Sequence, residues 1–211
     1  MSGDGPWREP DPRSVPDRGG IDANESDRRE AREGCDALVV VDVQQGFDDP
    51  AWGERNNPDA EERIARLLDF WRASDRPIVH LRHDSTEFDS PLRPDRPGNA
   101  FKPEVEPKEG EAVLGKEVNS GFVGTDLEAR LHGVGAERVT LVGLTTDHCV
   151  STTARTAANL GFETVVVTDA TATFDREGPS DVELSARESH DAALAHLHEE
   201  FASIVDTADL L

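Results

Sequence analysis

Several residue types and patterns are scarce in this sequence, and each scarcity excludes a class of protein. The 211 residues include only two cysteines, Cys35 and Cys149, which are too few for a disulfide framework. No apolar run approaches the roughly 18 residues that a membrane-spanning helix needs, and the first residues lack the apolar core of a signal peptide. We therefore expect a cytoplasmic protein that does not bind membranes.

Positive charge is also scarce. The chain has 22 Lys and Arg against 44 Asp and Glu, a formal net charge of -22, which argues against nucleic-acid binding because phosphate recognition needs a positive surface. Only Lys102, Lys108 and Lys116 are lysines. This acidic, lysine-poor composition is typical of proteins from salt-accumulating haloarchaea. High salt screens the self-repulsion of such a surface, so we expect a halophilic protein. The alternative is an acidic surface that binds a cationic partner.

The first 34 residues differ from the rest of the chain. They are rich in proline, glycine and charge, and they contain almost no apolar side chains. Such a segment cannot bury enough apolar surface to offset the entropy lost on ordering. We predict that residues 1–34 form a disordered, charged tail and that residues 35–211 form one domain.

Short apolar runs alternate with helical patterns from residue 37 onward. Continuous β-branched runs indicate strands buried on both faces, and six such runs are found at residues 37–41, 77–81, 111–114, 138–142, 164–167 and 202–205. Helical patterns occupy residues 58–74, 125–133, 149–160 and 184–201. Strand–helix alternation with right-handed crossovers predicts a Rossmann-like, three-layer α/β/α fold around a six-stranded parallel sheet.

Two local features refine this prediction. A capping box at residues 125–128 (TDLE) predicts the start of a helix. Residues 83–110 are proline-rich and too long for a simple turn, so we expect a surface excursion that flanks a site as a lid or forms a subunit interface.

Three reactive side chains follow three of the predicted strands. Asp42 ends the first strand, Lys116 follows the third after Gly115, and Cys149 lies just beyond the fourth. Ligands of open parallel sheets bind beyond the carboxyl ends of the strands. The sequence therefore brings a carboxylate, an amine and a thiol to one edge of the sheet.

These three groups suit nucleophilic attack on a carbonyl carbon. We place Cys149 in the first turn of a helix with Thr146 as N-cap, where the helix dipole and the Lys116 ammonium favour a thiolate. Asp42 can accept and return a proton, and backbone N–H groups at the helix start can hold an oxyanion. Taken singly, each residue also has a structural interpretation: a packed cysteine, a loop-capping aspartate and a surface lysine.

Four segments together resemble the isochorismatase-like cysteine hydrolase superfamily. They are residues 39–47 (VVVDVQQGF), 116–122 (KEVNSGF), 143–150 (GLTTDHCV) and 168–174 (TDATATF). The segments occur in the order and spacing of that superfamily and span nearly the whole predicted domain. The resemblance implies an isochorismatase-like hydrolase fold for residues 35–211.

The resemblance also implies a role for each reactive residue. Asp42, Lys116 and Cys149 would form the catalytic triad of the superfamily, with Cys149 carrying an acyl-thioester that water hydrolyses. Asp42 would move the protons, and Lys116 would orient the pair and stabilise charge. A cis peptide bond would fall between Leu144 and Thr145, and the N–H groups of Thr145 and Cys149 would face the oxyanion.

Differences between this sequence and branches of the superfamily restrict the type of reaction that the resemblance implies. The nicotinamidase branch binds a metal through an Asp-x-His pair and a later His between the catalytic Asp and Lys, whereas this interval holds only His80 and His83. We therefore expect no metal and no cofactor. True isochorismatases hydrolyse a vinyl ether and typically replace the cysteine, so the retained Cys149 favours hydrolysis of a C–N bond. Gly121 stands where the superfamily often has alanine, which would enlarge the pocket or loosen its loop.

The predicted function is hydrolysis of a small amide, ureido or carbamoyl compound by a homo-oligomer, either a dimer or a tetramer. The alternatives are a vinyl-ether hydrolase of the isochorismatase type and a catalytically idle relative that serves in binding or assembly. Aromatic and polar residues near the predicted strand ends are candidates for lining the substrate pocket, with core packing as the alternative for the aromatic ones. These candidates are Phe47, Trp52, Asn119, Phe122, Thr146 and Phe174.

Overall fold

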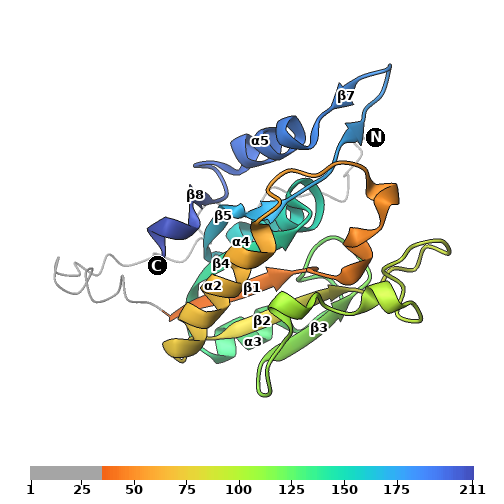
Figure 1. The fold of residues 1–211 in the computed structure, drawn as a ribbon. Helices are drawn as coiled ribbons and strands as arrows, with labels where there is room; N and C mark the ends of the chain where they lie inside the picture. Colours follow the sequence, from red (N-terminus) through yellow and green to blue (C-terminus); the bar gives the residue numbers. More distant parts are fainter. Residues whose placement is uncertain (1–34) are drawn as a thin grey trace, which may run out of the picture. The chain divides into compact units, whose positions relative to one another are not determined.

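The computed structural model describes residues 35–211, and the predicted tail lies outside this range. Within it, strands and helices alternate along the chain as the sequence pattern predicts (Figure 1). All six predicted strands form, most of them longer than the apolar runs that indicated them. They are β1 (Cys35–Val41), β2 (Ile78–His83), β3 (Ala112–Lys116), β4 (Ala136–Leu144), β5 (Glu163–Ala172) and β8 (Ser203–Val205).

The six strands form one parallel sheet in the order β3-β2-β1-β4-β5-β8. The chain begins in the middle with β1, winds to one edge through β2 and β3, and then returns to β4 beside β1. This reversal makes the carboxyl ends of β1 and β4 a topological switch point, which is where open α/β sheets bind ligands. The predicted α/β class and sheet are therefore confirmed.

Helices cover both faces of the sheet. Helix α2 (Ala60–Ala73) packs on one face through Ile64, Leu67, Leu68 and Trp71, which are all buried against β1. The opposite face carries α3 (Leu127–Gly133), α4 (Ser151–Asn159) and α5 (Ala186–Leu197). None of the helices within residues 35–211 is long and apolar enough to cross a membrane.

Local details differ from the prediction at two places. The capping box at residues 125–128 does not form. Asp126 is the N-cap of α3 without a side-chain bond, and the Thr125 hydroxyl donates to Gly121 O at 2.5 Å while it accepts from the Leu127 N–H at 3.3 Å. A short antiparallel hairpin of β6 (Arg176–Glu177) and β7 (Glu183–Leu184) precedes α5 and was not predicted. Its strands have two residues each, too few to show a hydrophobic period.

The proline-rich connection between β2 and β3 replaces a crossover helix. It contains two short turns, η5 (Pro97–Asn99) and η6 (Pro103–Val105), and it lies along the segment that follows β1. The Gln45 N–H donates to Ala100 O at 2.8 Å, and the Lys102 N–H donates to Val43 O at 3.0 Å. The connection therefore runs beside the carboxyl edge of the sheet, where the three reactive residues were predicted.

Candidate active site

Asp42, Lys116 and Cys149 converge at the carboxyl edge of the sheet. The Lys116 Nζ lies 2.6 Å from Asp42 Oδ2 and 3.4 Å from Cys149 Sγ, and it also donates to Val118 O at 3.1 Å. All three side chains are buried, with exposed fractions of 0% for Asp42, 2% for Lys116 and 8% for Cys149. A single ammonium therefore connects a carboxylate and a thiol that are separated by about a hundred residues of sequence.

The backbone at the ends of β1 and β4 is shaped for this convergence. Asp42 has φ of 51°, a left-handed conformation that is uncommon for a residue with a side chain. Gly143 has φ of 121°, and a Cβ at this position would lie 2.1 Å from Val41 O. Only glycine therefore lets β4 approach the end of β1 this closely. The peptide bond between Leu144 and Thr145 is cis, at the position that the resemblance implied.

Cys149 lies in a π-helical turn, η7 (Thr146–Val150), that continues directly into α4. The prediction that Thr146 is the N-cap of this helix is wrong. Thr145 occupies the cap position without a side-chain bond, while the buried Thr146 hydroxyl pairs with His190 Nδ1 at 2.9 Å. Thr146 therefore connects the turn to α5, and its predicted contact with a substrate stays a prediction.

Burial controls the electrostatics of the triad. It raises the pKa of the Cys149 thiol well above its usual range, and the Asp42 carboxylate acts in the same direction while Lys116 opposes it. Burial also raises the pKa of the Asp42 carboxyl, against the opposing effect of Lys116. The expectation of a resting thiolate is thus wrong, because burial outweighs the ammonium. The resting thiol keeps its proton and needs a base.

A base with a free lone pair is in place. Asp42 Oδ1 is buried and has no hydrogen-bond partner among the described residues, and the carboxylate and Cys149 Sγ lie within 4.8 Å of one another. Asn119 Oδ1 is 3.6 Å from the same sulfur. Proton transfer from the thiol to Asp42 would produce a nucleophile beside the Lys116 ammonium.

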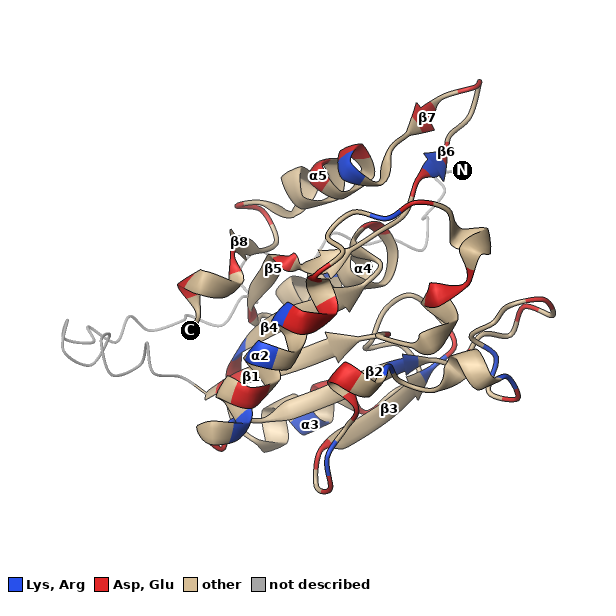
Figure 2. Ribbon diagram, in the orientation of Figure 1, with Lys and Arg blue, Asp and Glu red and all other residues tan. Residues whose placement is uncertain are grey.

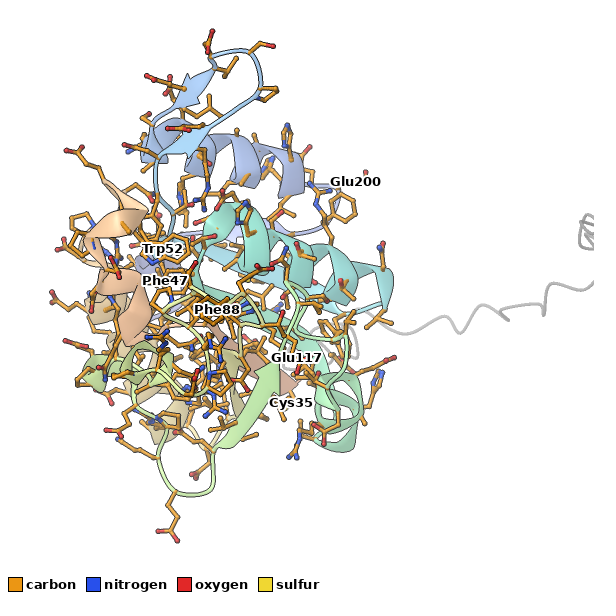
Figure 3. All side chains as sticks on the ribbon, turned by 90° about the vertical axis from the view of Figure 1, so that its right-hand side faces the viewer. Cys35, Phe47, Trp52, Phe88, Glu117 and Glu200 are labelled. Atoms are coloured by element: carbon orange, nitrogen blue, oxygen red, sulfur yellow. The ribbon has the colours of Figure 1, made fainter. Side chains whose placement is uncertain are left out.

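Three of the predicted aromatic pocket residues form one stack. Ring centroids are 5.1 Å apart for Phe47 and Trp52, 5.5 Å for Trp52 and Phe174, and 6.0 Å for Phe47 and Phe174. Phe47 and Trp52 lie in the two short turns η3 (Gln45–Asp48) and η4 (Pro50–Trp52) that follow β1, and Figure 3 shows them next to each other. The stack packs on Leu144, the residue before Thr145, so it borders the candidate oxyanion position.

Phe122 and Gly121 lie away from this stack. Phe122 stacks on Phe162 at 6.1 Å and packs against the core between α3 and α4, so the structure favours the packing interpretation for it. A Cβ on Gly121 would lie 2.4 Å from Leu81 Cδ1. The methyl missing at Gly121 therefore makes room for Leu81 in the core and does not enlarge a pocket.

Comparison with known proteins identifies the family of this chain. Residues 36–209 match the isochorismatase domain. The chain belongs to the isochorismatase family of hydrolases. The family protein YrdC of Bacillus subtilis is 44% identical over 175 residues, which cover 83% of this chain and 94% of YrdC. An isochorismatase-family structure from Chromobacterium violaceum has 45% identity and a TM-score of 0.80, covering 82% of this chain and 90% of that one. Maleamate amidohydrolase of Pseudomonas putida is 29% identical over 192 residues, 83% of this chain and 84% of that enzyme.

His83 is a member of the site that sequence reasoning considered only as a metal ligand. Its Nδ1 lies 3.4 Å from Lys116 Nζ, and burial together with Lys116 lowers the pKa of the imidazole to about 4, so the ring is neutral. His83 ends β2, between the strands that carry Asp42 and Lys116. The rule that directed attention to strand ends would also have identified it.

The residues of the site also determine whether it could hold a metal ion. Asp42, His83 and Cys149 are the only cluster within residues 35–211 whose potential ligand atoms approach one another within 4.8 Å. The Lys116 ammonium contacts all three side chains. A metal cation would have to displace this buried positive charge, so these residues do not fit a metal site while Lys116 is in place.

A second network, which the sequence did not reveal, holds the turn that carries Cys149. The Asp147 carboxylate accepts hydrogen bonds from Arg176 Nε at 2.6 Å, from the Thr173 hydroxyl at 2.5 Å and from the Ser189 hydroxyl at 3.3 Å. The Arg176 and Thr173 bonds keep the pKa of Asp147 far below its usual range, although burial opposes them. The turn is thereby tied to the β6–β7 hairpin and to α5.

Proposed function

We propose that this isochorismatase-family hydrolase is a cysteine amidohydrolase that cleaves a C–N bond of a small amide, ureido or carbamoyl compound. The observation that carries the proposal is the Lys116 ammonium in contact with both Asp42 and Cys149 in a buried cluster. A retained thiol beside a buried base suits acyl transfer. The resemblance to maleamate amidohydrolase, which is named for C–N hydrolysis, supports the same reaction class.

The acylation step moves one proton and one leaving group. Asp42 Oδ1 takes the thiol proton as the Cys149 sulfur attacks the carbonyl carbon. The resulting oxyanion accepts hydrogen bonds from backbone N–H groups of Thr145 and Cys149. The tetrahedral intermediate then expels ammonia or an amine, which receives the proton from Asp42, and an acyl-thioester remains on Cys149.

Deacylation repeats the proton transfers with water. Asp42 removes a proton from the water that attacks the thioester, and it returns this proton to the departing Cys149 sulfur. Lys116 stays protonated and stabilises the negative charge on Asp42 and on the sulfur as it alternates between them. The products are a carboxylic or carbamic acid and the restored thiol, and no cofactor takes part.

The test is hydrolysis of a panel of small amides, ureido acids and carbamoyl compounds in molar potassium chloride, followed by ammonia or amine release. We expect release that disappears in Cys149→Ala, together with a trapped acyl-enzyme whose added mass resides on Cys149. Release that is unchanged in Cys149→Ala would refute the thioester. Hydrolysis of a vinyl ether with no turnover of any amide would favour the isochorismatase-type reaction.

We also propose that the protein is a homo-oligomer, as the resemblance implies. Size-exclusion chromatography with light scattering in molar salt should give a multiple of the 23.0 kDa chain mass. A single species at the chain mass would refute this.

A further inference from the structure

A cavity adjoins the triad through His83. It has a volume of about 460 Å³, and its lining includes the imidazole of His83, the Trp52 indole and the Phe88 ring. We call it the Trp52–Phe88 cavity. Its His83 wall is the same ring whose Nδ1 lies 3.4 Å from Lys116 Nζ. The triad side chains do not line the cavity themselves, so a substrate with its scissile carbonyl at Cys149 would reach this space past the imidazole of His83.

The walls of this cavity are aromatic and acidic. Phe88 is 76% exposed, an unusual position for a phenylalanine ring. Glu87 and Asp89 flank it, and neither carboxylate forms an ion pair with any residue in the range 35–211. The Arg93 guanidinium lies 5.8 Å from the centroid of the Phe88 ring and is already paired with Asp95.

A second cavity on the other side of Trp52 has the same character. It measures about 870 Å³, and five carboxylates line it, those of Glu54, Asp175, Glu177, Glu183 and Glu188. Among the described residues that line it, Arg176 is the only cation, and its charge is paired with Asp147. The surroundings of Trp52 thus offer negative charge with no free positive charge among the described side chains.

The linings of the cavities are not uniformly acidic. Acidic residues are spread over the helices and loops in Figure 2, yet a cavity of about 650 Å³ at the opposite edge of the sheet gathers cations. Arg72, Arg76, Lys108 and Arg130 line it, against three carboxylates. Another cavity at that same edge, of about 400 Å³, is lined by Glu163, Glu199 and Glu200 and by no Lys or Arg among the described residues. Acidic linings therefore occur at both edges of the sheet, and the Trp52–Phe88 cavity is distinguished by its His83 wall beside Lys116.

We propose that the Trp52–Phe88 cavity binds a cationic group, an alkylammonium, on the substrate that Cys149 attacks. An alkylammonium can interact with both the aromatic and the acidic side chains of the cavity, because aromatic faces attract cations and carboxylates form ion pairs with them. A substrate carboxylate would meet Glu87 and Asp89 with no cation to receive it. This inference rests on the proposed function for the position of the reacting bond, and it adds the chemical class of the substrate.

Binding can be measured without catalysis in Cys149→Ala. Three probes share a butanamide chain and differ in the terminal group: 4-(trimethylammonio)butanamide is cationic, 5,5-dimethylhexanamide is its neutral isostere, and glutaramate carries a carboxylate. Titration followed by tryptophan fluorescence, at constant potassium chloride, should show the cationic probe binding at least about fivefold more tightly than the neutral one. The carboxylate probe should bind most weakly.

Matched charge variants locate the effect. In the Cys149→Ala background, the added pair Glu87→Gln and Asp89→Asn should reduce the cation preference to less than twofold. Adding the pair Glu199→Gln and Glu200→Gln instead removes two exposed carboxylates that line a different cavity and should leave the preference unchanged. Glu200 is labelled in Figure 3. Equal binding of the cationic and neutral probes, a preference that survives in the Glu87/Asp89 variant, or no binding of any probe would each overturn the proposal.

Turnover separates this proposal from the proposed function. If the preference is found in Cys149→Ala but the native chain releases no ammonia from any of the probes, the cation subsite stands and amide hydrolysis is refuted for these substrates. If the native chain hydrolyses the neutral amide or glutaramate at least as well as the cationic one, hydrolysis stands and the cation subsite fails.

Discussion

The three lysines of this chain differ sharply in their surroundings. Lys102 is 6% exposed and Lys116 is 2% exposed, whereas Lys108 is exposed. Lys102 Nζ bonds Asp48 at 2.5 Å and Glu61 at 2.7 Å, so it joins the connection between β2 and β3 to α2. In a sequence almost without lysine, two of the three are buried and paired with carboxylates.

Replacing Lys116 tests the buried pair directly. Lys116→Met leaves the Asp42 carboxylate buried without its partner, which costs about 3–5 kcal/mol of unfolding free energy. We also expect kcat/KM to fall by about 10²–10⁴-fold, because Asp42 then holds its proton too tightly to act as a base. Denaturant unfolding and steady-state rates check the two effects.

The matched control for this variant is the double replacement Asp42→Asn with Lys116→Met. Removing both charges avoids the isolated buried carboxylate, so much of the lost stability should return while activity stays absent. If the double variant is no more stable than Lys116→Met, the ion pair is not the source of the loss.

His83 gives a pH dependence with a defined sign. Its pKa is lowered to about 4 in the folded chain from 6.5, so between these values the unfolded chain binds more protons and stability falls as the pH falls. His83→Gln should remove about 1–2 kcal/mol of the stability lost between pH 7 and pH 4.5. Urea unfolding at the two pH values measures this. His196→Gln, at an exposed position on α5, should keep the native pH dependence.

The reactive residues show what sequence reasoning reaches at the scale of single residues. Asp42, Lys116 and Cys149 follow strands, so topology alone predicts that they meet. The protonation state of Cys149 was predicted wrongly, because it depends on a depth of burial that no local pattern encodes. Arg176 was missed because it acts across 29 residues on Asp147, from a hairpin too short to predict.

At the scale of elements, the presence of each main helix and strand could be predicted from the sequence, but the residues at which they begin and end could not. Every predicted helix and strand forms, since each buries a continuous apolar run or stripe. Caps depend on single hydrogen bonds that compete with other partners. Thr125 stands one residue before the N-cap of α3 and bonds both Gly121 O and the Leu127 N–H, whereas Ser185 caps α5 in a complete capping box with Glu188.

The β6–β7 hairpin supports the Cys149 turn, which gives a prediction at this scale. Arg176→Met removes two donors from Asp147 and should cost about 1–3 kcal/mol. We expect kcat to fall by about 10–100-fold, because a small displacement of Cys149 disturbs the attack geometry. Arg187→Met removes an exposed ion pair with Asp191 on α5 and should change stability by less than about 0.5 kcal/mol. Equal effects of the two variants would contradict a supporting role for the hairpin.

The charge of the whole molecule predicts its response to salt. The acidic side chains, which give the chain a net charge of -22, repel one another. Salt screens this repulsion beyond a Debye length of about 10 Å at 0.1 M and about 3 Å at 1 M. Unfolding free energy should therefore rise with potassium chloride over this range. Sucrose at matched osmolality is the control, and it should give a smaller rise because it screens no charge. Stability that is independent of salt would refute the halophilic interpretation.

Lys116 comes from the outermost strand of the sheet. Strand β3 is bonded to β2 alone, whereas β1 and β4, which carry Asp42 and lead to Cys149, are bonded on both sides. Edge strands open at lower free energy than central ones. Catalysis thus depends on one of the two edge strands of the described sheet, β3, while β8 is the other. As urea is raised, activity should be lost before the fluorescence of Trp71, which belongs to α2 and packs against β1, changes. The order of these two losses then shows which part of the sheet unfolds first.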